Sequence, residues 1–292
     1  MLKINACAKI NLFLDVLDRR ADGYHDVRTV IQSVSLCDRL SFNVTCGKSS
    51  VLYDEFPGKD KEDDLVYKAW KVVRERSDKV ENILIDVKKS IPVAAGLGGG
   101  SADAAGTLVG LNSNCRLSLS DKQLRSMAAD LGADVPFFLK GGTYLAEAIG
   151  TELKELPPMP ECFVVIMDPG VEVSTTWAYK AFDEVHWKDP KPKQDISGLL
   201  HALKEGDYKK VCASLYNAFE DIVFDKYPQV GQLKTVAMEN GADAALMSGS
   251  GPAVFALALS ESQAERIKKK VSGLVKDAYL CRTCQSGLEI VE

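Results

Sequence analysis

The first residues of the chain alternate between apolar and other side chains. The apolar set occupies every second position and comprises Leu2, Ile4, Ala6, Ala8, Ile10, Leu12 and Leu14. Because successive side chains of a strand point to opposite faces, this alternation predicts a strand with one apolar face. Lys9 and Asn11 belong to the intervening set, so we expect them to project together from the other face.

Helical and strand patterns follow along the rest of the chain. Ser120 and Gln123 form a capping-box pattern before an apolar stripe, and Gly132 is placed to end that helix. Further helices are predicted at 65–76, 196–205, 207–218, 228–239 and 262–273. Strands are predicted at 83–87, at 162–168 and, at a sheet edge, at 278–284, and surface loops at 54–64 and 187–195.

The domain organisation follows from length and from one proline-rich segment. A chain of 292 residues exceeds the usual size of a single core, so two domains are expected. The segment LPPMP at 156–160 is the best boundary, which gives domains at 1–156 and 157–292. Strands and helices mix in both halves, so the predicted class is α+β, or mixed α/β.

The most distinctive stretch is IPVAAGLGGGSADAAGTL, residues 91–108, with five glycines between Gly96 and Gly106. It follows a predicted strand and precedes a predicted helix that Ser101 can cap, and whose buried face would be Ala102, Ala105, Leu108 and Val109. Glycines let backbone amides approach a ligand closely, and a helix N-terminus adds unpaired N–H groups. The pattern therefore favours a phosphate-binding loop over a linker or a structural turn. It is neither a Walker A loop nor a Rossmann fingerprint.

Composition and cysteine usage exclude several classes of protein. With 36 basic and 41 acidic residues the net charge is −5, which argues against a chain-wide nucleic-acid surface. The sequence has no membrane-spanning run and no signal peptide, so a cytoplasmic protein is expected. The eight scattered cysteines are expected to be free thiols, and the lone pair Cys281 and Cys284 is not expected to bind metal or act in redox chemistry.

Three motifs together resemble the GHMP small-molecule kinase superfamily: Lys9 on a strand, the Gly96–Ser101 loop and the Ser248–Gly251 turn. The resemblance covers most of the chain. The segments AKINLFLDVLDRRADGYHDVRTVIQSVSLCD, PVAAGLGGGSADAAGTL, LGADVPFFLKGG and SGSGPAVFAL fall in the order of the branch that phosphorylates a cytidine diphosphate-linked methylerythritol. It implies an N-terminal nucleotide-binding domain, a C-terminal ferredoxin-like domain, and a substrate held between them.

The resemblance also implies a reaction. The γ-phosphate of ATP would move to the 2-hydroxyl of the cytidine diphosphate-linked methylerythritol, a step of the non-mevalonate isoprenoid route. Asp134 matches the base of the family and Lys9 its electrostatic partner, with Asn11 beside the substrate. On local grounds alone, Asp134 is better explained as a helix cap, and a solvated strand position is the usual one for a lysine such as Lys9.

The remaining site residues are likewise carried over from the resemblance. Tyr24 and His25 would hold the cytosine, and Lys140 and Thr175 would contact the diphosphate and methylerythritol ends. The ATP contacts would be Lys89, Pro92, Val93, Ala94, Ala95, Gly96, Leu97, Gly98, Gly99, Gly100, Ser101 and Ala102. Asp64 stands where the family often has Asn near the adenine, which leaves that contact open. Mg²⁺ is expected with ATP; Ser101 is a candidate, and its other ligands stay open.

Two alternatives remain at this point. The chain could be another GHMP kinase, of the homoserine or mevalonate type, although those substrates carry no base for Tyr24 and His25 to read. It could also be a non-catalytic nucleotide-binding module that has kept the loops. In each case the partner is a small molecule, not a nucleic acid or a membrane, and the protein is a monomer or a homodimer.

Overall fold

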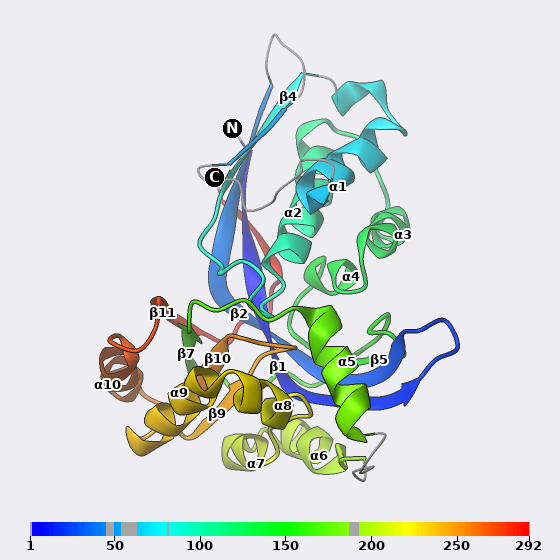
Figure 1. Ribbon diagram of the computed structural model, residues 1–292. Helices are drawn as coiled ribbons and strands as arrows, with labels where there is room; N and C mark the ends of the chain where they lie inside the picture. The colour runs from blue at the N-terminus through cyan, green and yellow to red at the C-terminus, as the bar shows by residue number, and fades with distance from the viewer. Residues whose placement is uncertain (1, 45–49, 54–62, 81, 187–192, 292) are drawn as a thin grey trace.

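The computed structural model describes residues 2–44, 50–53, 63–80, 82–186 and 193–291 (Figure 1). Within these residues a large sheet of eight strands runs the length of the molecule, with β1 and β2 forming its long central hairpin. Its strands are β1 (Leu2–Arg19), β2 (His25–Val44), β3 (Ser50–Tyr53), β4 (Ile83–Lys88), β5 (Thr143–Glu147), β6 (Glu152–Glu155), β8 (Tyr216–Asn217) and β12 (Leu288–Val291). The final strand β12 pairs with β1, which brings the two ends of the chain together.

The second sheet is antiparallel and small. Its strands are β7 (Phe163–Asp168), β9 (Ala244–Met247), β10 (Val254–Ala258) and β11 (Asp277–Arg282), in the order β11-β7-β10-β9. The helices α9 (Pro228–Glu239) and α10 (Glu261–Val271) lie between successive strands in sequence and pack on this sheet. A strand order of 4-1-3-2 with these two helices is the ferredoxin-like arrangement, so that prediction is confirmed.

The other helices divide between the two sheets, as Figure 1 shows. They are α1 (Leu65–Arg74), the 3₁₀ turn η2 (Asp78–Val80), α2 (Gly99–Asn114), α3 (Asp121–Leu131), α4 (Val135–Phe138), α5 (Thr175–His186), α6 (Ser197–Glu205), α7 (Tyr208–Ala213) and α8 (Glu220–Lys226). The first four α-helices pack on one side of the large sheet through a common apolar core. The predicted helix after Ser120 is confirmed, with Gln123 Oε1 accepting the Ser120 N–H at 2.9 Å.

Two predictions about secondary structure are wrong. The helix predicted at 207–218 ends at Ala213, because the chain then pairs with β1 in parallel and the Asn217 amide donates to Met247 O and Gly249 O. The helix after the glycine loop starts at Gly99 with Gly98 as its N-cap, so Ser101 lies inside the first turn and is not the cap. Most of the predicted loops at 54–64 and 187–195 lies outside the described residues.

Strand β1 is buried on both faces, contrary to the prediction of a single apolar face. Residues from Ala6 to Val16 are all buried, and Lys9 and Asn11 are only 5% and 4% exposed. Irregularities in the pairing with β2 after Cys7 and after Asn11 interrupt the simple alternation. A strand that reads as half-polar therefore lies at the centre of the molecule, and its polar side chains require internal partners.

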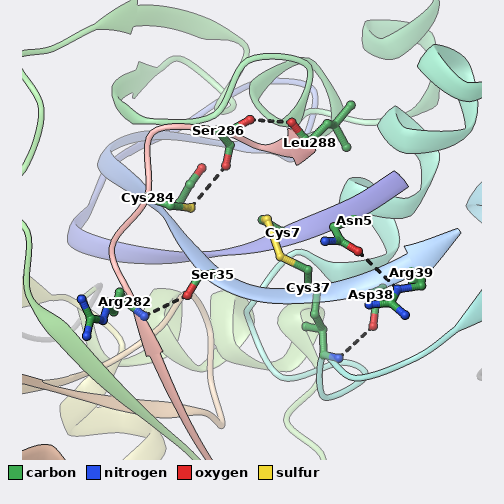
Figure 2. Close-up of a disulfide and its surroundings, with 12 residues drawn as sticks. Asn5, Cys7, Ser35, Cys37, Asp38, Arg39, Arg282, Cys284, Ser286 and Leu288 are labelled. Carbon is green, nitrogen blue, oxygen red and sulfur yellow. Dashed lines mark hydrogen bonds between the residues drawn. A yellow bond between two sulfur atoms is a disulfide. The ribbon is translucent and has the colours of Figure 1, made fainter. Parts of the chain in front are cut away.

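Two cysteines are joined where free thiols were predicted. Cys7 of β1 and Cys37 of β2 face each other in the ladder with their Cα atoms 4.0 Å apart, and they form a disulfide (Figure 2). Directly opposed positions on adjacent antiparallel strands bring two side chains within bonding reach. The free cysteines among the described residues are Cys115, Cys162, Cys212, Cys281 and Cys284. In the described part of the chain, no helix is long and apolar enough to cross a membrane.

Candidate active site

The glycine loop joins β4 to α2 through a series of left-handed residues. Ala94, Gly96 and Gly98 have φ of 55°, 80° and 72°. A side chain at Gly98 would place its Cβ 2.6 Å from the Phe138 ring and 3.2 Å from Lys9 Cγ. Gly98 is therefore required both by conformation and by space. The turn directs the chain into α2, whose N-terminal amides carry partial positive charge.

A cavity of about 280 Å³ opens along this loop. It is lined by Asp64, Leu65, Val66, Lys89, Pro92, Val93, Ala94, Ala95, Gly96, Gly98, Gly99, Gly100, Ser101 and Asp103. The structure thus brings together every residue predicted to contact ATP except Leu97 and Ala102, whose side chains are buried behind the loop. Asp64 lines the cavity from the start of α1, where its carboxylate also accepts the Tyr67 N–H at 2.8 Å.

The loop is held between β1 and a turn from the C-terminal half. The Leu97 carbonyl accepts the Lys9 N–H at 3.0 Å, and the Ala95 carbonyl accepts the Ala253 N–H at 3.2 Å. A Cβ on Gly96 would overlap the carbonyl oxygen of Ser248, so the two backbones are in direct contact. The two glycine motifs that are far apart in sequence therefore pack directly against each other.

Lys9 lies beneath the loop in a chain of hydrogen bonds. Its ammonium donates to Asn11 Oδ1 at 2.6 Å, and the Asn11 amide donates to Thr29 Oγ1 at 2.8 Å. The Thr29 hydroxyl in turn donates to the Phe13 carbonyl at 2.6 Å. Each polar side chain in this row has a partner, so the ammonium is fixed in position. The alternative of a solvated strand lysine is excluded.

Asp134 shares an electrostatic environment with Lys9. Burial lowers the pKa of Lys9 below its usual value, and the nearby Asp134 carboxylate acts in the opposite direction. Asp134 occupies the N-cap position of α4, but its side chain makes no capping hydrogen bond. The carboxylate is thus not used as a helix cap, the role suggested for it on local grounds. The closest partner of the ammonium is Asn11 rather than Asp134.

The hairpin turn between β1 and β2 carries Tyr24 and His25 to helix α5. His25 Nε2 lies 2.7 Å from Asp183 Oδ1, and its ring stacks on Tyr179 with centroids 4.9 Å apart. Tyr24 is 64% exposed beside them. Burial raises the pKa of Tyr179 to about 12, and the proximity of Asp134 adds to that shift. Tyr179 therefore contacts the histidine ring and lies near the candidate base.

Sequence reasoning missed Tyr179 and Asp183. Both lie on α5, one helical turn apart, so their side chains share a face. That spacing was the available signal, but the helix itself was not predicted.

Thr175 and Lys140 lie in different surroundings. Thr175 begins α5, and its hydroxyl is 2.9 Å from that of Ser250 in the second glycine turn, which places it at the site wall. Lys140 follows α4, and its side chain is 54% exposed. Its ammonium lies 3.9 Å from a Glu155 carboxylate oxygen, and among the described residues no contact joins it to Lys9 or the glycine loop.

Lys89 forms a largely buried cluster in the wall of the cavity. Its ammonium donates to Asp38 and, at 2.5 Å, to Asp103 Oδ2. Asp38 also accepts the Ile91 N–H at 2.8 Å, so the cluster ties the loop's first residues to β2 and α2. Asp103 Oδ1 is buried without a hydrogen-bond partner among the described residues. Burial and the second carboxylate raise the pKa of Asp103 to about 8, although Lys89 opposes this.

The thiols of Cys281 and Cys284 lie in largely buried surroundings. Burial raises the pKa of the Cys281 thiol, and it raises that of Cys284 to about 11. Such thiols stay protonated near neutral pH and are poor nucleophiles. No group of three or more His, Cys, Asp or Glu residues in the described part of the chain is placed to hold a metal ion.

Comparison with known proteins identifies relatives along the whole chain. The family described as GHMP kinases N terminal domain matches residues 64–142, and GHMP kinases C terminal matches 199–277. The 4-diphosphocytidyl-2-C-methyl-D-erythritol kinase of Exiguobacterium sibiricum is 39% identical over 280 residues, covering 96% of each chain. That of Enterococcus faecalis is 40% identical over 282 residues, covering 95% of this chain and 97% of the relative.

Solved structures show the same likeness. A 4-(cytidine 5'-diphospho)-2C-methyl-D-erythritol kinase superposes with a TM-score of 0.82 at 32% identity, over 96% of this chain and 98% of the other. A homoserine kinase from Cytophaga hutchinsonii superposes with a TM-score of 0.75 at 21% identity, over 99% and 97%. The second likeness is one of fold.

The geometry of the glycine loop predicts the effect of Gly98→Val. The new side chain would meet Phe138 and Lys9 at a residue with φ of 72°, so the loop must shift. We expect nucleotide affinity, measured by calorimetry with ATP, to fall at least about tenfold, given a strain on the order of 1–3 kcal/mol. Gly273→Val is the matched control, since a Cβ there has no neighbour within 4 Å. Unchanged ATP affinity in Gly98→Val would show that the loop does not depend on this residue.

The buried Asp103 predicts a pH-dependent stability. Its pKa is about 8 in the folded protein against 3.8 for the ordinary group, so the folded state binds one more proton than the unfolded state between these values. The stability due to that proton is complete below pH 3.8 and is lost as the pH rises to about 8. Urea unfolding at pH 5 to 8 should give a slope on the order of 1 kcal/mol per pH unit that Asp103→Asn lacks. Parallel curves for the two proteins would contradict this assignment.

Proposed function

Because this chain belongs to the 4-diphosphocytidyl-2-C-methyl-D-erythritol kinase family of the GHMP kinases, we propose that it transfers the γ-phosphate of ATP to the 2-hydroxyl of 4-diphosphocytidyl-2-C-methyl-D-erythritol. It is an ATP-dependent small-molecule kinase of isoprenoid precursor biosynthesis. The observation that carries the assignment of roles is the buried ammonium of Lys9, held by Asn11 beneath the glycine loop and near Asp134.

The reaction requires an activated hydroxyl and stabilisation of charge on the moving phosphoryl group. We assign Asp134 as the base that accepts the proton of the hydroxyl, because its carboxylate is not used in capping the helix. Lys9 places a positive charge near that carboxylate and offsets negative charge on the phosphoryl oxygens, an effect that is strong in a buried site. Since the ammonium is bonded to Asn11, it needs no reorganisation during transfer.

The cavity along the glycine loop is the proposed ATP site. The amides at the start of α2 are suited to the phosphates, and the apolar wall formed by Leu65, Val66 and Pro92 is suited to the purine ring. Lys89 is fixed by Asp38 and Asp103, so we assign it to the wall of this site rather than to a mobile phosphate contact.

Mg²⁺ fits this site as a phosphate-held ion. Ser101 lines the cavity and can add one hydroxyl oxygen, whereas the Asp103 oxygen nearest Lys89 is already engaged. The ion usually keeps most of its ligands from phosphate and water, so a single protein oxygen is sufficient. When bound, it supplies charge neutralisation at the phosphates.

The cytidine end of the substrate is assigned to the hairpin and helix α5. Tyr24 offers an exposed aromatic face, and His25 and Tyr179 form a stacked pair beside it. Thr175 lies between this end and the second glycine turn, in keeping with a contact to the linking groups. Lys140 is kept as a diphosphate contact on the family resemblance alone.

Two rival functions are less well supported. A homoserine or mevalonate substrate offers no base for the His25, Tyr179 and Tyr24 group. A non-catalytic module would not require a desolvated lysine near an aspartate whose side chain caps no helix. We further infer that the protein acts in the cytoplasm on a small molecule, without nucleic acid, as a monomer or a homodimer.

The assignment of the base predicts the effect of Asp134→Asn. The amide keeps the shape of the carboxylate but cannot accept a proton, so kcat should fall roughly 10²–10⁴-fold. Binding of ATP should be nearly unchanged. The measurement is turnover with ATP and 4-diphosphocytidyl-2-C-methyl-D-erythritol, followed by ³¹P NMR of the phosphorylated product. Asp130→Asn, on the exposed side of α3, is the control. Near wild-type turnover in Asp134→Asn would remove it from the base role.

A further inference from the structure

Asp183 makes a contact that the proposed reaction does not explain. Its Oδ1 lies 2.7 Å from His25 Nε2, although the two residues are 158 positions apart and belong to different elements. The histidine side chain is 8% exposed and that of the aspartate 22%. The pair joins the β1–β2 hairpin to α5.

Besides the imidazole of His25, a guanidinium also faces the Asp183 carboxylate. Arg19 Nη1 lies 3.7 Å from Asp183 Oδ2, on the same hairpin as His25. Arg19 and His25 therefore both hold Asp183 against the β1–β2 hairpin.

The contact between His25 Nε2 and Asp183 Oδ1 decides which nitrogen of the neutral His25 ring carries the proton. An ionised carboxylate only accepts hydrogen bonds, so Nε2 must be the donor in the pair. In the neutral ring, Nδ1 then has a lone pair and acts as an acceptor. Among the described residues, Nδ1 has no hydrogen-bond partner. In the same part of the chain, the fully buried polar side-chain atoms without a partner are Asp103 Oδ1 and Asn114 Nδ2, so Nδ1 is not sealed from solvent. Nδ1 is thus open to a ligand.

Stacking fixes the direction of that lone pair. The His25 ring lies on Tyr179 at an interplanar angle of 27°, and Tyr179 is held edge-on by Phe219 at 4.9 Å between centroids. With one face covered and Nε2 bound, the imidazole cannot rotate without losing both contacts. The acceptor at Nδ1 is therefore preorganised.

An acceptor at this position distinguishes two pyrimidines. Cytosine presents an exocyclic amine donor where a uracil ring presents a carbonyl acceptor. We propose that Asp183 is a specificity-determining positioning residue, which holds His25 Nδ1 as an acceptor for that amine and so favours a cytidine diphosphate over a uridine diphosphate. This inference rests on the proposed function, because it takes His25 as the contact of the base.

The test compares CDP with UDP by calorimetry, with ADP present at saturation to occupy the ATP site. We expect the wild-type protein to prefer CDP by about tenfold or more, since a mismatched polar pair in a partly buried site is costly. In Asp183→Leu this ratio should fall towards one. Asp183→Asn keeps an acceptor for Nε2–H and should retain more of the ratio. Glu184→Gln, an exposed neighbour on α5, should leave it unchanged.

A second measurement needs no variant. The ¹⁵N chemical shifts of His25 in the intact protein report which nitrogen is protonated, and we expect the tautomer with the proton on Nε2. An unprotonated Nε2 would overturn the role of Asp183, and so would an Asp183→Leu variant whose ratio of CDP to UDP affinity equals that of the wild type. If the wild-type protein still phosphorylates the substrate, the proposed function stands in either case. Failure of the wild-type protein to bind CDP at all would overturn both.

Discussion

The site depends on the close packing of one glycine loop between two parts of the chain that are distant in sequence. Gly96 lies against the Ser248 backbone, and the next residue accepts the Lys9 N–H through its carbonyl. A Cβ on Gly96 would overlap the Ser248 carbonyl oxygen, so only glycine allows this close packing. This close packing of the glycine loop shapes the cavity along the loop. It also covers Lys9 and joins β1 to the turn that precedes β10.

Burial of Lys9 links this packing to chemistry. A lysine removed from water interacts more strongly with nearby charge, and here its position is fixed through Asn11 and Thr29. On one side lies the cavity assigned to ATP. On the other, Asp134 lies near both Lys9 and Tyr179, and Tyr179 stacks on His25, the residue assigned to the base of the substrate.

The sequence predicted the parts of the site that local pattern encodes. The glycine loop and the capping box at Ser120 could be predicted, since periodicity and turn residues specify them within a short window. The ferredoxin-like second sheet was expected only from the resemblance to the GHMP kinases. The burial of both faces of β1 could not be predicted from the strand itself. It arises because the glycine loop and the second sheet cover this half-polar strand. The Cys7–Cys37 pair and the contact of Asp183 with His25 depend on strand register and on helix docking, which no short window contains.

We propose that the desolvated ammonium of Lys9 accelerates phosphoryl transfer and contributes little to the affinity for either substrate. Single-turnover transfer from γ-labelled ATP to 4-diphosphocytidyl-2-C-methyl-D-erythritol by Lys9→Met tests it directly, because methionine fills similar space without charge. We predict a transfer rate lower by roughly 10²-fold or more, the usual scale for a preorganised electrostatic contact, with both dissociation constants within a few-fold of wild type. Transfer at close to the wild-type rate would contradict the account.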